Sequence, residues 1–386
     1  MTLKFKVEYL NAIRKRYYQS SKKDKSRILN ELCAVAGYNR KYAIRILALK
    51  HHEGKKYSGR TKAYSERTQK HLKHLWIIMG EMCSKKMVIA LKTWLKYYED
   101  PDCDDLVREE LISMSSASID RYLKKYKSEL GRRKRTGTKP GKMFKNVIPL
   151  KDFNSEIAEP GHVECDTVAH CGDSLTGKFV WSLTFTDVYS GWTENRAIFG
   201  KDSDEVLSAI MDIKFKLPFN LLSFNTDNGT EFLNRNLYLY FDAQKNIQFT
   251  RSRPYKKNDN AHVEQKNWTH VREYFGYERF DLVDQAEHMN IIYKLYLNAL
   301  NNFFVPQTKL IEKIRVGSKI VKKYDKPKTP FERLLESKSL SMGQKEILRK
   351  QYNLLNPIEL RNIIKRQIAH LQKIKKEDEL NFKMAS

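Results

Sequence analysis

The chain has 386 residues and a formal net charge of +26, from 72 Lys and Arg against 46 Asp and Glu. Hydrophobic residues make up 41% of the sequence, which is enough for folded cores and excludes a disordered polycation. No apolar stretch approaches the roughly 18–20 residues of a membrane-spanning helix, and the first residues lack the apolar centre of a signal peptide. Five scattered cysteines without a C-x-x-C pair argue against a disulfide framework. We therefore expect an intracellular protein with no membrane-spanning segment.

The positive charge is concentrated in the first part of the chain. Residues 1–150 contain 36 Lys and Arg against 15 Asp and Glu, a net charge of +21, whereas residues 151–386 carry only +5. A basic module joined to a nearly balanced one is typical of proteins that bind a polyanion, and nucleic acid is the favoured partner. An anionic membrane surface is the alternative.

Two short helices joined by a turn are predicted between residues 24 and 50. Gly37 follows the first helix at a natural stop, and Asn39 can cap the second. This is the plan of a helix-turn-helix whose second helix reads DNA in the major groove, although any two amphipathic helices share the pattern. The apolar positions are Ile28, Leu32 and Val35 in the first helix and Tyr42, Ile46 and Leu49 in the second. The expected DNA contacts are Arg40, Lys41 and Arg45.

A second copy of this plan is predicted near residues 105–130, with its turn at Ser113–Ser116. It follows a helical stretch at residues 66–98, whose apolar residues we assign to a core. Two copies on a basic segment favour specific DNA binding. The apolar positions are Leu106, Val107, Leu111, Ile119, Tyr122, Leu123 and Tyr126, and the expected DNA contacts are Arg121 and Lys124. Residues 132–150 form a basic linker that can follow a phosphate backbone or simply be solvated, through Arg132, Arg133 and Arg135.

The pattern changes to strands near residue 160. Three successive strands, then a helix, a strand, a helix, a strand and a helix, predict an α/β domain with a mixed sheet. The strands are expected at residues 162–168, 179–186, 192–199, 221–224 and 247–250, and the helices at residues 204–217, around 237–241 and from 261 onward.

Three acidic residues can meet in this arrangement. Asp166 lies within the first strand, Asp227 just past the fourth, and Glu264 in the first turn of the helix after the fifth. Ligands of open α/β sheets collect beyond the carboxyl ends of the strands. Carboxylates held close together repel one another unless cations lie between them, and hard oxygen ligands suit Mg²⁺ or Mn²⁺. Two such ions would support an in-line phosphodiester displacement.

These motifs resemble the catalytic core of DDE transposases and retroviral-type integrases. The resemblance rests on the strand aspartate, the TDNGTEF turn at residues 226–232, the KNDNAHVEQKN segment at 257–267, and the 36 residues between Asp227 and Glu264. Together with the basic helical front and the stretch at residues 303–335, the layout resembles bacterial insertion-sequence transposases.

The resemblance implies an RNase H-like fold and a known chemistry. Asp166 would bridge two Mg²⁺ ions, Asp227 would hold one and Glu264 the other, with Mn²⁺ able to substitute. The enzyme would bind the terminal inverted repeats of its element, nick the DNA, and join the new 3′-OH to target DNA. A homodimer or larger assembly on double-stranded DNA, in the bacterial cytoplasm at the nucleoid, is implied as well.

Residues near the three acids receive lesser roles. Gly229 is expected to let the chain turn tightly, and Asn228 to position a water or phosphate or to serve as a turn residue. Asp259 is expected to be a turn or helix-cap residue, and Glu264 is preferred to it as the third acid. Cys165, next to Asp166, is expected to be buried on the opposite face, and no structural zinc is expected. The expected DNA contacts here are Lys256, Lys257, Lys266 and Asn267.

The C-terminal region is expected to be mainly helical, with a basic hairpin at residues 309–323. A helix starting at Asn356-Pro357 carries a near-heptad apolar stripe that serves either a core or a subunit contact. The whole chain is thus predicted to be multidomain, with all-α helix-turn-helix domains, an α/β RNase H-like catalytic domain and a helical C-terminal region. The boundaries are 1–60, 61–131, a linker at 132–150, 151–281 and 282–386.

Two other functions remain open at this stage. One is a metal-dependent DNA nuclease without strand transfer. The other is a DNA-binding regulator with an inert core, which the presence of all three acids disfavours.

Overall fold

The computed structural model describes residues 3–48, 64–127, 148, 157–253, 261–316 and 319–385. The chain divides into two compact units, Met1–Ser65 and Glu66–Ser386. No helix within these described ranges is long and apolar enough to cross a membrane. The predicted contacts that lie outside the described residues are Arg132, Arg133, Arg135, Lys256 and Lys257, and the same holds for Leu49 and Asp259.

The first unit contains three helices, α1 (Leu3–Gln19), α2 (Lys22–Ala36) and α3 (Arg40–Ala48). Gly37 ends α2 with a φ of 68°, as the turn prediction requires. The predicted buried faces are partly wrong, because Val35 and Tyr42 are 47% and 40% exposed. Neighbouring small or branched residues at the adjacent helical positions face the core instead. The buried set is Ile13, Ile28, Leu29, Leu32, Ala36, Ala43 and Leu47.

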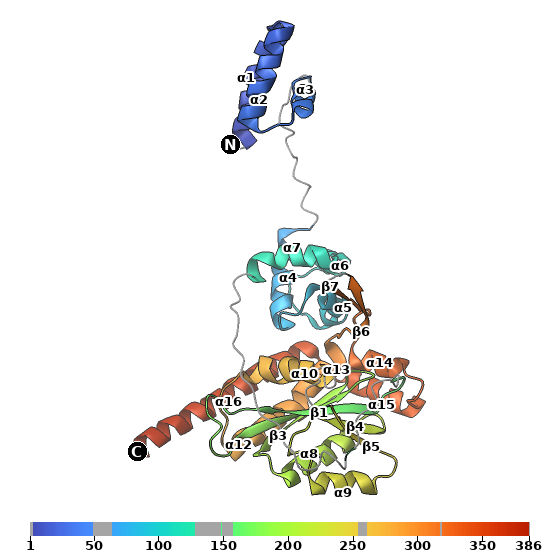
Figure 1. Ribbon diagram of the computed structural model, residues 1–386. Helices are drawn as coiled ribbons and strands as arrows, with labels where there is room; N and C mark the ends of the chain where they lie inside the picture. The colour runs from blue at the N-terminus through green and yellow to red at the C-terminus, as the bar shows by residue number, and fades with distance from the viewer. Residues whose placement is uncertain are drawn as a thin grey trace. The chain divides into compact units, whose positions relative to one another are not determined.

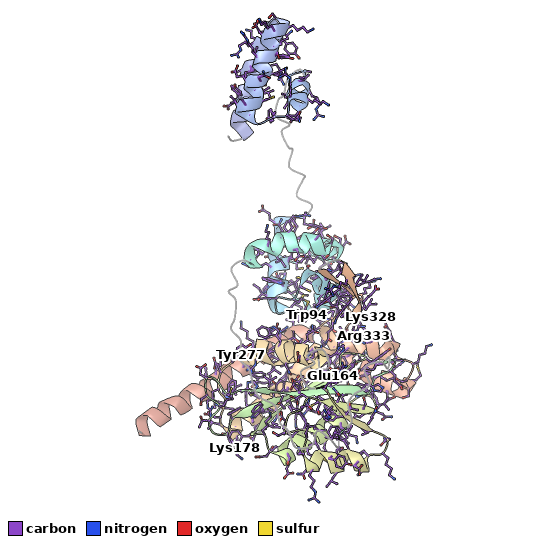
Figure 2. The ribbon with its side chains drawn as sticks, viewed as in Figure 1. Trp94, Glu164, Lys178, Tyr277, Lys328 and Arg333 are labelled. Atoms are coloured by element: carbon purple, nitrogen blue, oxygen red, sulfur yellow. The ribbon has the colours of Figure 1, made fainter. Side chains whose placement is uncertain are left out.

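The second unit begins with helices around a core centred on Trp76 and Trp94. The Trp94 indole donates a hydrogen bond to the Phe304 carbonyl 3.1 Å away, which ties this region to the end of the later helix α13 (Asn298–Phe304) (Figure 2). Leu106 was expected in the core but is 73% exposed, whereas Val107 and Leu111 are buried. The helices are α4 (Glu66–Ile78), α5 (Ser84–Trp94), the short η1 (Leu95–Tyr97), α6 (Asp105–Ser113) and α7 (Ser116–Lys127).

A five-stranded mixed sheet forms the centre of the second unit, in the order β3-β2-β1-β4-β5. β1 pairs antiparallel with β2 and parallel with β4, and β4 pairs parallel with β5. The predicted alternation of strands and helices is confirmed, with the fourth strand starting two residues later than expected. The strands are β1 (His162–Ala169), β2 (Val180–Asp187), β3 (Thr193–Phe199), β4 (Ser223–Thr226) and β5 (Gln248–Arg251).

Helices cover both faces of this sheet (Figure 1). α8 (Ser203–Lys216) and α9 (Arg235–Ala243) bury one apolar face each against the side that carries Cys165, which is fully buried as expected. α10 (Ala261–Lys266) lies on the other side and continues without a break into the π-helical η2 (Asn267–Arg272) and α11 (Glu273–Phe275). The face of β1 opposite Cys165 is therefore the one on which α10 lies.

The outer edge of β3 is closed by side-chain amides instead of another strand. Asn302 accepts a hydrogen bond from the Thr193 N–H and donates to the Thr193 carbonyl, both at 2.9 Å. Asn298 and Asn290 accept from the N–H groups of Asn195 and Ala197 in the same way. An asparagine amide carries one acceptor and a donor, as a peptide group does, so it can satisfy an edge residue. These amides come from α12 (Val283–Ile291) and α13, which are joined by the π-helical η3 (Ile292–Leu297).

The chain ends with a ribbon and three helices. The predicted hairpin is β6 (Leu310–Val316) paired with β7 (Lys319–Tyr324). α14 (Pro330–Glu336) and α15 (Met342–Asn353) follow, and α16 (Pro357–Ala385) begins at the expected proline. Leu360, Ile364 and Leu371 of α16 are buried within this chain, packed against η3 and its flanking helices. The core alternative for the α16 stripe is therefore the one that the structure supports.

Candidate active site

The pairing of β1 with β4 brings two of the predicted acids together. Cys165 is the register partner of Thr226, the last residue of β4. The next residue of β1 is Asp166, and Asp227 directly follows the end of β4. Both carboxylates line one pocket.

The pocket has a volume of about 440 Å³ and opens beside the end of β1. Its lining is largely polar, with two cationic groups, Lys201 and Arg272, near the carboxylates. Lys201 lies over the Trp181 ring, 4.2 Å from its centroid. Such a pocket is suited to a charged ligand and is too polar for an apolar one.

Burial disfavours the ionised forms of the two aspartates. Burial and the neighbouring Asp227 raise the pKa of Asp166 well above its usual range. Burial, followed by the nearby Glu231, raises the pKa of Asp227 in the same direction. Backbone N–H donors oppose this, from Thr167 to Asp166 and from Gly229 to Asp227, each at 2.8 Å. The Asn267 amide and the Lys201 charge act in the same direction, on Asp166 and Asp227 respectively. The protein therefore holds like charges together without compensating them fully.

A glutamate that the sequence analysis did not assign belongs to this pocket. Glu231 is 4% exposed, and its Oε1 accepts from the Thr167 hydroxyl at 2.9 Å and pairs with the Lys201 ammonium at 2.5 Å. It thereby joins the loop after β4 to β1 beside Asp166. Its only signal in the sequence is its position inside the TDNGTEF turn, four residues after Asp227.

Glu231 also explains Gly229. The chain turns at Gly229 as expected, since the N–H groups of Phe232 and Leu233 both donate to its carbonyl, although its φ is not positive. A Cβ at this position would instead lie 2.4 Å from Glu231 Oε2. Gly229 is thus needed for space, because the buried carboxylate packs directly on its backbone.

The third acid, Glu264, lies in the first turn of α10 and is exposed, outside the pocket lining. Asn267, three residues later and on about the same helical face, lines the pocket and donates a hydrogen bond to Asp166 Oδ2 at 2.7 Å. The structure therefore brings Asp166, Asp227 and Asn267 together, and places Glu264 one helical turn away.

Glu164 fixes the start of α10 above the sheet. It is 1% exposed and lies two residues before Asp166, on the same face of β1 (Figure 2). Its Oε2 accepts from the backbone N–H groups of His262 and Val263, at 3.2 and 3.3 Å. With Glu164 at the start of α10 and Asp166 beside Asn267, the helix runs along β1, and Glu264 lies between the two attachment points.

Lys266 does not reach the surface as the expected DNA contact requires. It is 6% exposed, and burial together with the nearby Lys86 and Arg333 lowers its pKa well below the usual range. Asn228 is 8% exposed and donates to the Ser252 carbonyl, so it serves the loop structure. The predicted contacts on the helices are exposed, namely Arg40, Lys41, Arg45, Arg121 and Lys124.

The chemistry of the pocket fits a divalent cation. Within the described ranges, no three His, Cys, Asp or Glu side chains stand at the spacing of a complete metal site. Two buried oxygens of the pocket, Glu231 Oε2 and Asn267 Oδ1, nevertheless have no hydrogen-bond partner. Unpaired oxygens beside repelling carboxylates are the donor set that Mg²⁺ or Mn²⁺ prefers. Asp166 and Asp227 are the residues placed to hold such an ion.

The integrase core domain is the family whose model matches this chain, over residues 157–257. The uncharacterized protein y4rM of Sinorhizobium fredii (strain NBRC 101917 / NGR234) is 34% identical over 339 residues, covering 85% of this chain and 94% of that protein. Among solved structures, the HTLV-2 integrase catalytic core domain in complex with magnesium is 20% identical, covering 30% of this chain and 71% of that one, with a TM-score of 0.24.

The matched range contains Asp166 and Asp227 together with all five strands of the sheet. An integrase core indicates DNA integration of the transposase type, carried out by an enzyme of the polynucleotidyl transferase kind. The likeness to y4rM extends well beyond this core, over most of both proteins. The chain therefore belongs to the insertion-sequence DDE transposases with an integrase-type, RNase H-like core.

Proposed function

We propose that the protein is a transposase that binds the terminal inverted repeats of its own element, nicks the DNA at their ends, and joins the 3′-OH to target DNA with the help of Mg²⁺. The observation that carries this proposal is the polar pocket that is lined by both Asp166 of β1 and Asp227, which directly follows β4. A simple nucleic-acid-binding surface would not bury two repelling carboxylates, whose pKa values are raised by burial.

In this proposal the pocket supplies the metal ligands and the helix α10 completes them. Asp166 and Asp227 hold the cations, and Glu264 joins them from α10, which Glu164 and Asn267 attach along β1. Bound Mg²⁺ would activate the attacking oxygen and stabilise the leaving oxygen of the phosphodiester exchange. Mn²⁺ would serve in place of Mg²⁺ because it accepts the same hard oxygen ligands.

The helices at the front of the chain are assigned to DNA recognition. Arg40, Lys41 and Arg45 of α3 and Arg121 and Lys124 of α7 are exposed and lie on second helices of two short helix pairs. Arginine and lysine on such helices contact phosphates and guanine edges. Recognition of two element ends calls for at least a homodimer of the chain. The domain boundaries at residues 60, 131, 150 and 281 remain part of the proposal.

The proposal is tested with labelled DNA that carries the element ends, unlabelled target DNA and Mg²⁺, with products separated on a denaturing gel. We expect nicked ends and longer joined products from the natural chain. Asp227→Asn should lower joining by roughly a thousandfold, because each lost metal-ligand charge removes several kcal/mol of transition-state stabilisation. The matched control is Asp242→Asn on α9, which makes the same chemical change at an exposed site.

The outcomes separate the candidate functions. Nicks without joined products would favour the nuclease, and DNA binding without either product would favour the regulator. Full activity of Asp227→Asn would remove the pocket from the reaction.

A further inference from the structure

The β6–β7 ribbon is a surface that the proposed active site does not use. Every described residue with a classified exposure in it, Leu310–Arg315 and Ile320–Tyr324, is exposed. The ribbon and its turn, residues 309–324, carry six lysines and arginines and one acid, Glu312. Two strands with both faces open to solvent are marginal in stability, so a partner that covers one face would stabilise the ribbon.

The register shows that the two faces differ in chemistry. Residues directly opposite each other in an antiparallel pair share a face. One face carries the pairs Glu312–Lys323 and Ile314–Val321, an opposite-charge pair and an apolar pair. The other face carries the pairs Lys313–Lys322 and Arg315–Ile320. We call the second face the basic face.

The basic face contains a conflict that the first face lacks. Lys313 and Lys322 stand directly across the ribbon from each other, and like charges in that position destabilise a strand pair. Neither lysine forms an ion pair in the part of the chain that the structure describes. On the opposite face, the single acid of the ribbon is placed against Lys323. A polyanion lying on the basic face would remove the repulsion between Lys313 and Lys322.

From this we infer that the basic face of the ribbon, defined by Lys313, Arg315, Ile320 and Lys322, is a docking surface for the phosphate backbone of double-stranded DNA. A two-stranded β-ribbon has the width to enter the major groove of B-DNA, and lysine and arginine side chains neutralise its phosphates. The inference deepens the proposed function by assigning a DNA contact outside the helices and the catalytic pocket.

The test measures binding of the full chain to a fluorescent 30-base-pair duplex of arbitrary sequence by anisotropy, at several salt concentrations. Lys313→Gln combined with Lys322→Gln removes two charges from the basic face. The matched control, Lys323→Gln with Lys338→Gln, removes two charges from the opposite face and from an exposed loop. All four substitutions lie at exposed positions away from the pocket. The measurement reports DNA binding alone and needs no joining reaction.

For the basic-face variant we expect about tenfold weaker binding at 0.1 M salt, and a salt dependence reduced by about two phosphate contacts. We also expect its thermal unfolding temperature to match or exceed that of the natural chain, because the repulsion between Lys313 and Lys322 is gone. The control should bind nearly as the natural chain does.

Equal binding by the two variants would overturn the inference. A change of oligomeric state in the basic-face variant, with DNA affinity unchanged, would also overturn it, because the face would then contact a second copy of the chain. If the natural chain itself shows no salt-dependent DNA binding, the proposed function fails instead.

Discussion

Two groups of buried polar side chains lie on the same sheet, and they differ in whether their carboxylates are surrounded by hydrogen-bond donors or by other carboxylates. At the β3 edge, Asn298 and Asn302 match the free N–H groups of the strand, and Glu194 is surrounded by Arg196, Trp192 and Asn298 as donors. In the pocket beside β1, by contrast, carboxylates face one another. Both regions contain unpaired buried oxygens, Asn195 Oδ1 on β3 and Glu231 Oε2 and Asn267 Oδ1 in the pocket, but those of the pocket lie beside repelling carboxylates.

The difference separates structural from functional burial. A buried polar group with all its partners rigidifies the fold, whereas one without them costs free energy that the fold must supply elsewhere. The β3 edge gains stability from its polar groups. In the pocket, the repulsion between buried carboxylates costs stability, and two of its oxygens have no hydrogen-bond partner.

The largest expected loss of stability comes from opening the β3 edge. Asn298→Ala should lower the free energy of unfolding of the second unit by about 2–3 kcal/mol, because the Asn195 N–H and the Glu194 carboxylate both lose a buried partner. Urea unfolding followed by tryptophan fluorescence reports this unit alone, since all five tryptophans lie within Glu66–Ser386. Mn²⁺ binding should be unchanged in this variant. A parallel loss of Mn²⁺ affinity would show that the two regions are not independent.

A smaller effect is expected from His170, a buried residue between the two regions. Its Nε2 lies 2.8 Å from the Ser182 hydroxyl, and burial, with Arg272 nearby, lowers its pKa to about 3. The folded chain therefore keeps this imidazole neutral while the unfolded chain protonates it below pH 6.5, so stability is lost as the pH falls from 6.5 towards 3. The loss from this group should be about 2 kcal/mol at pH 5.

The measurement compares urea unfolding at pH 7 and pH 5. His170→Gln keeps a donor for Ser182 and cannot be protonated, so its stability should fall less between the two pH values than that of the natural chain. The control is His288→Gln, the same substitution at a half-exposed histidine of α12. An identical pH dependence in His170→Gln and the natural chain would contradict the assignment.

The sequence predicted the pocket better than the edge. Alternating hydrophobicity located the strands, and the acids at the ends of β1 and β4 could be paired because carboxyl ends of neighbouring parallel strands meet. Glu231 was missed because its partners, Thr167 and Lys201, lie 64 and 30 positions away and no local pattern connects them.

The closure of β3 left no signal that a single sequence can show. Asn290, Asn298 and Asn302 look like the polar side of an ordinary surface helix, since their partners lie about 100 residues earlier in the chain. Periodicity also located helices without fixing which neighbouring apolar residue faces the core, as the exposed Val35 and Leu106 show. Local propensity thus predicts elements, whereas long-range packing decides which of their residues meet.

The same substitution can be made in both regions. Replacing a carboxylate by its amide should change the free energy of unfolding in opposite directions at Asp227 and Glu194. In metal-free buffer at pH 8, Asp227→Asn should raise the free energy of unfolding by about 1–2 kcal/mol, because one of several repelling charges is removed at nearly constant shape. Burial raises the pKa of Glu194 as well, but Arg196, Trp192 and Asn298 oppose the shift as buried partners. Glu194→Gln should therefore lower the free energy of unfolding, because Arg196 then loses its buried charged partner.

Adding Mg²⁺ should then make the natural chain more stable than Asp227→Asn. An ion that binds only the folded chain stabilises it in proportion to its occupancy, so the natural chain should gain stability with Mg²⁺ concentration while Asp227→Asn should not. Glu194→Gln, which leaves the pocket intact, should gain as much as the natural chain does, although it starts lower. If Asp227→Asn were destabilising without metal, the pocket would be an ordinary polar core. The pocket and the β3 edge would then not differ in how their buried carboxylates affect stability.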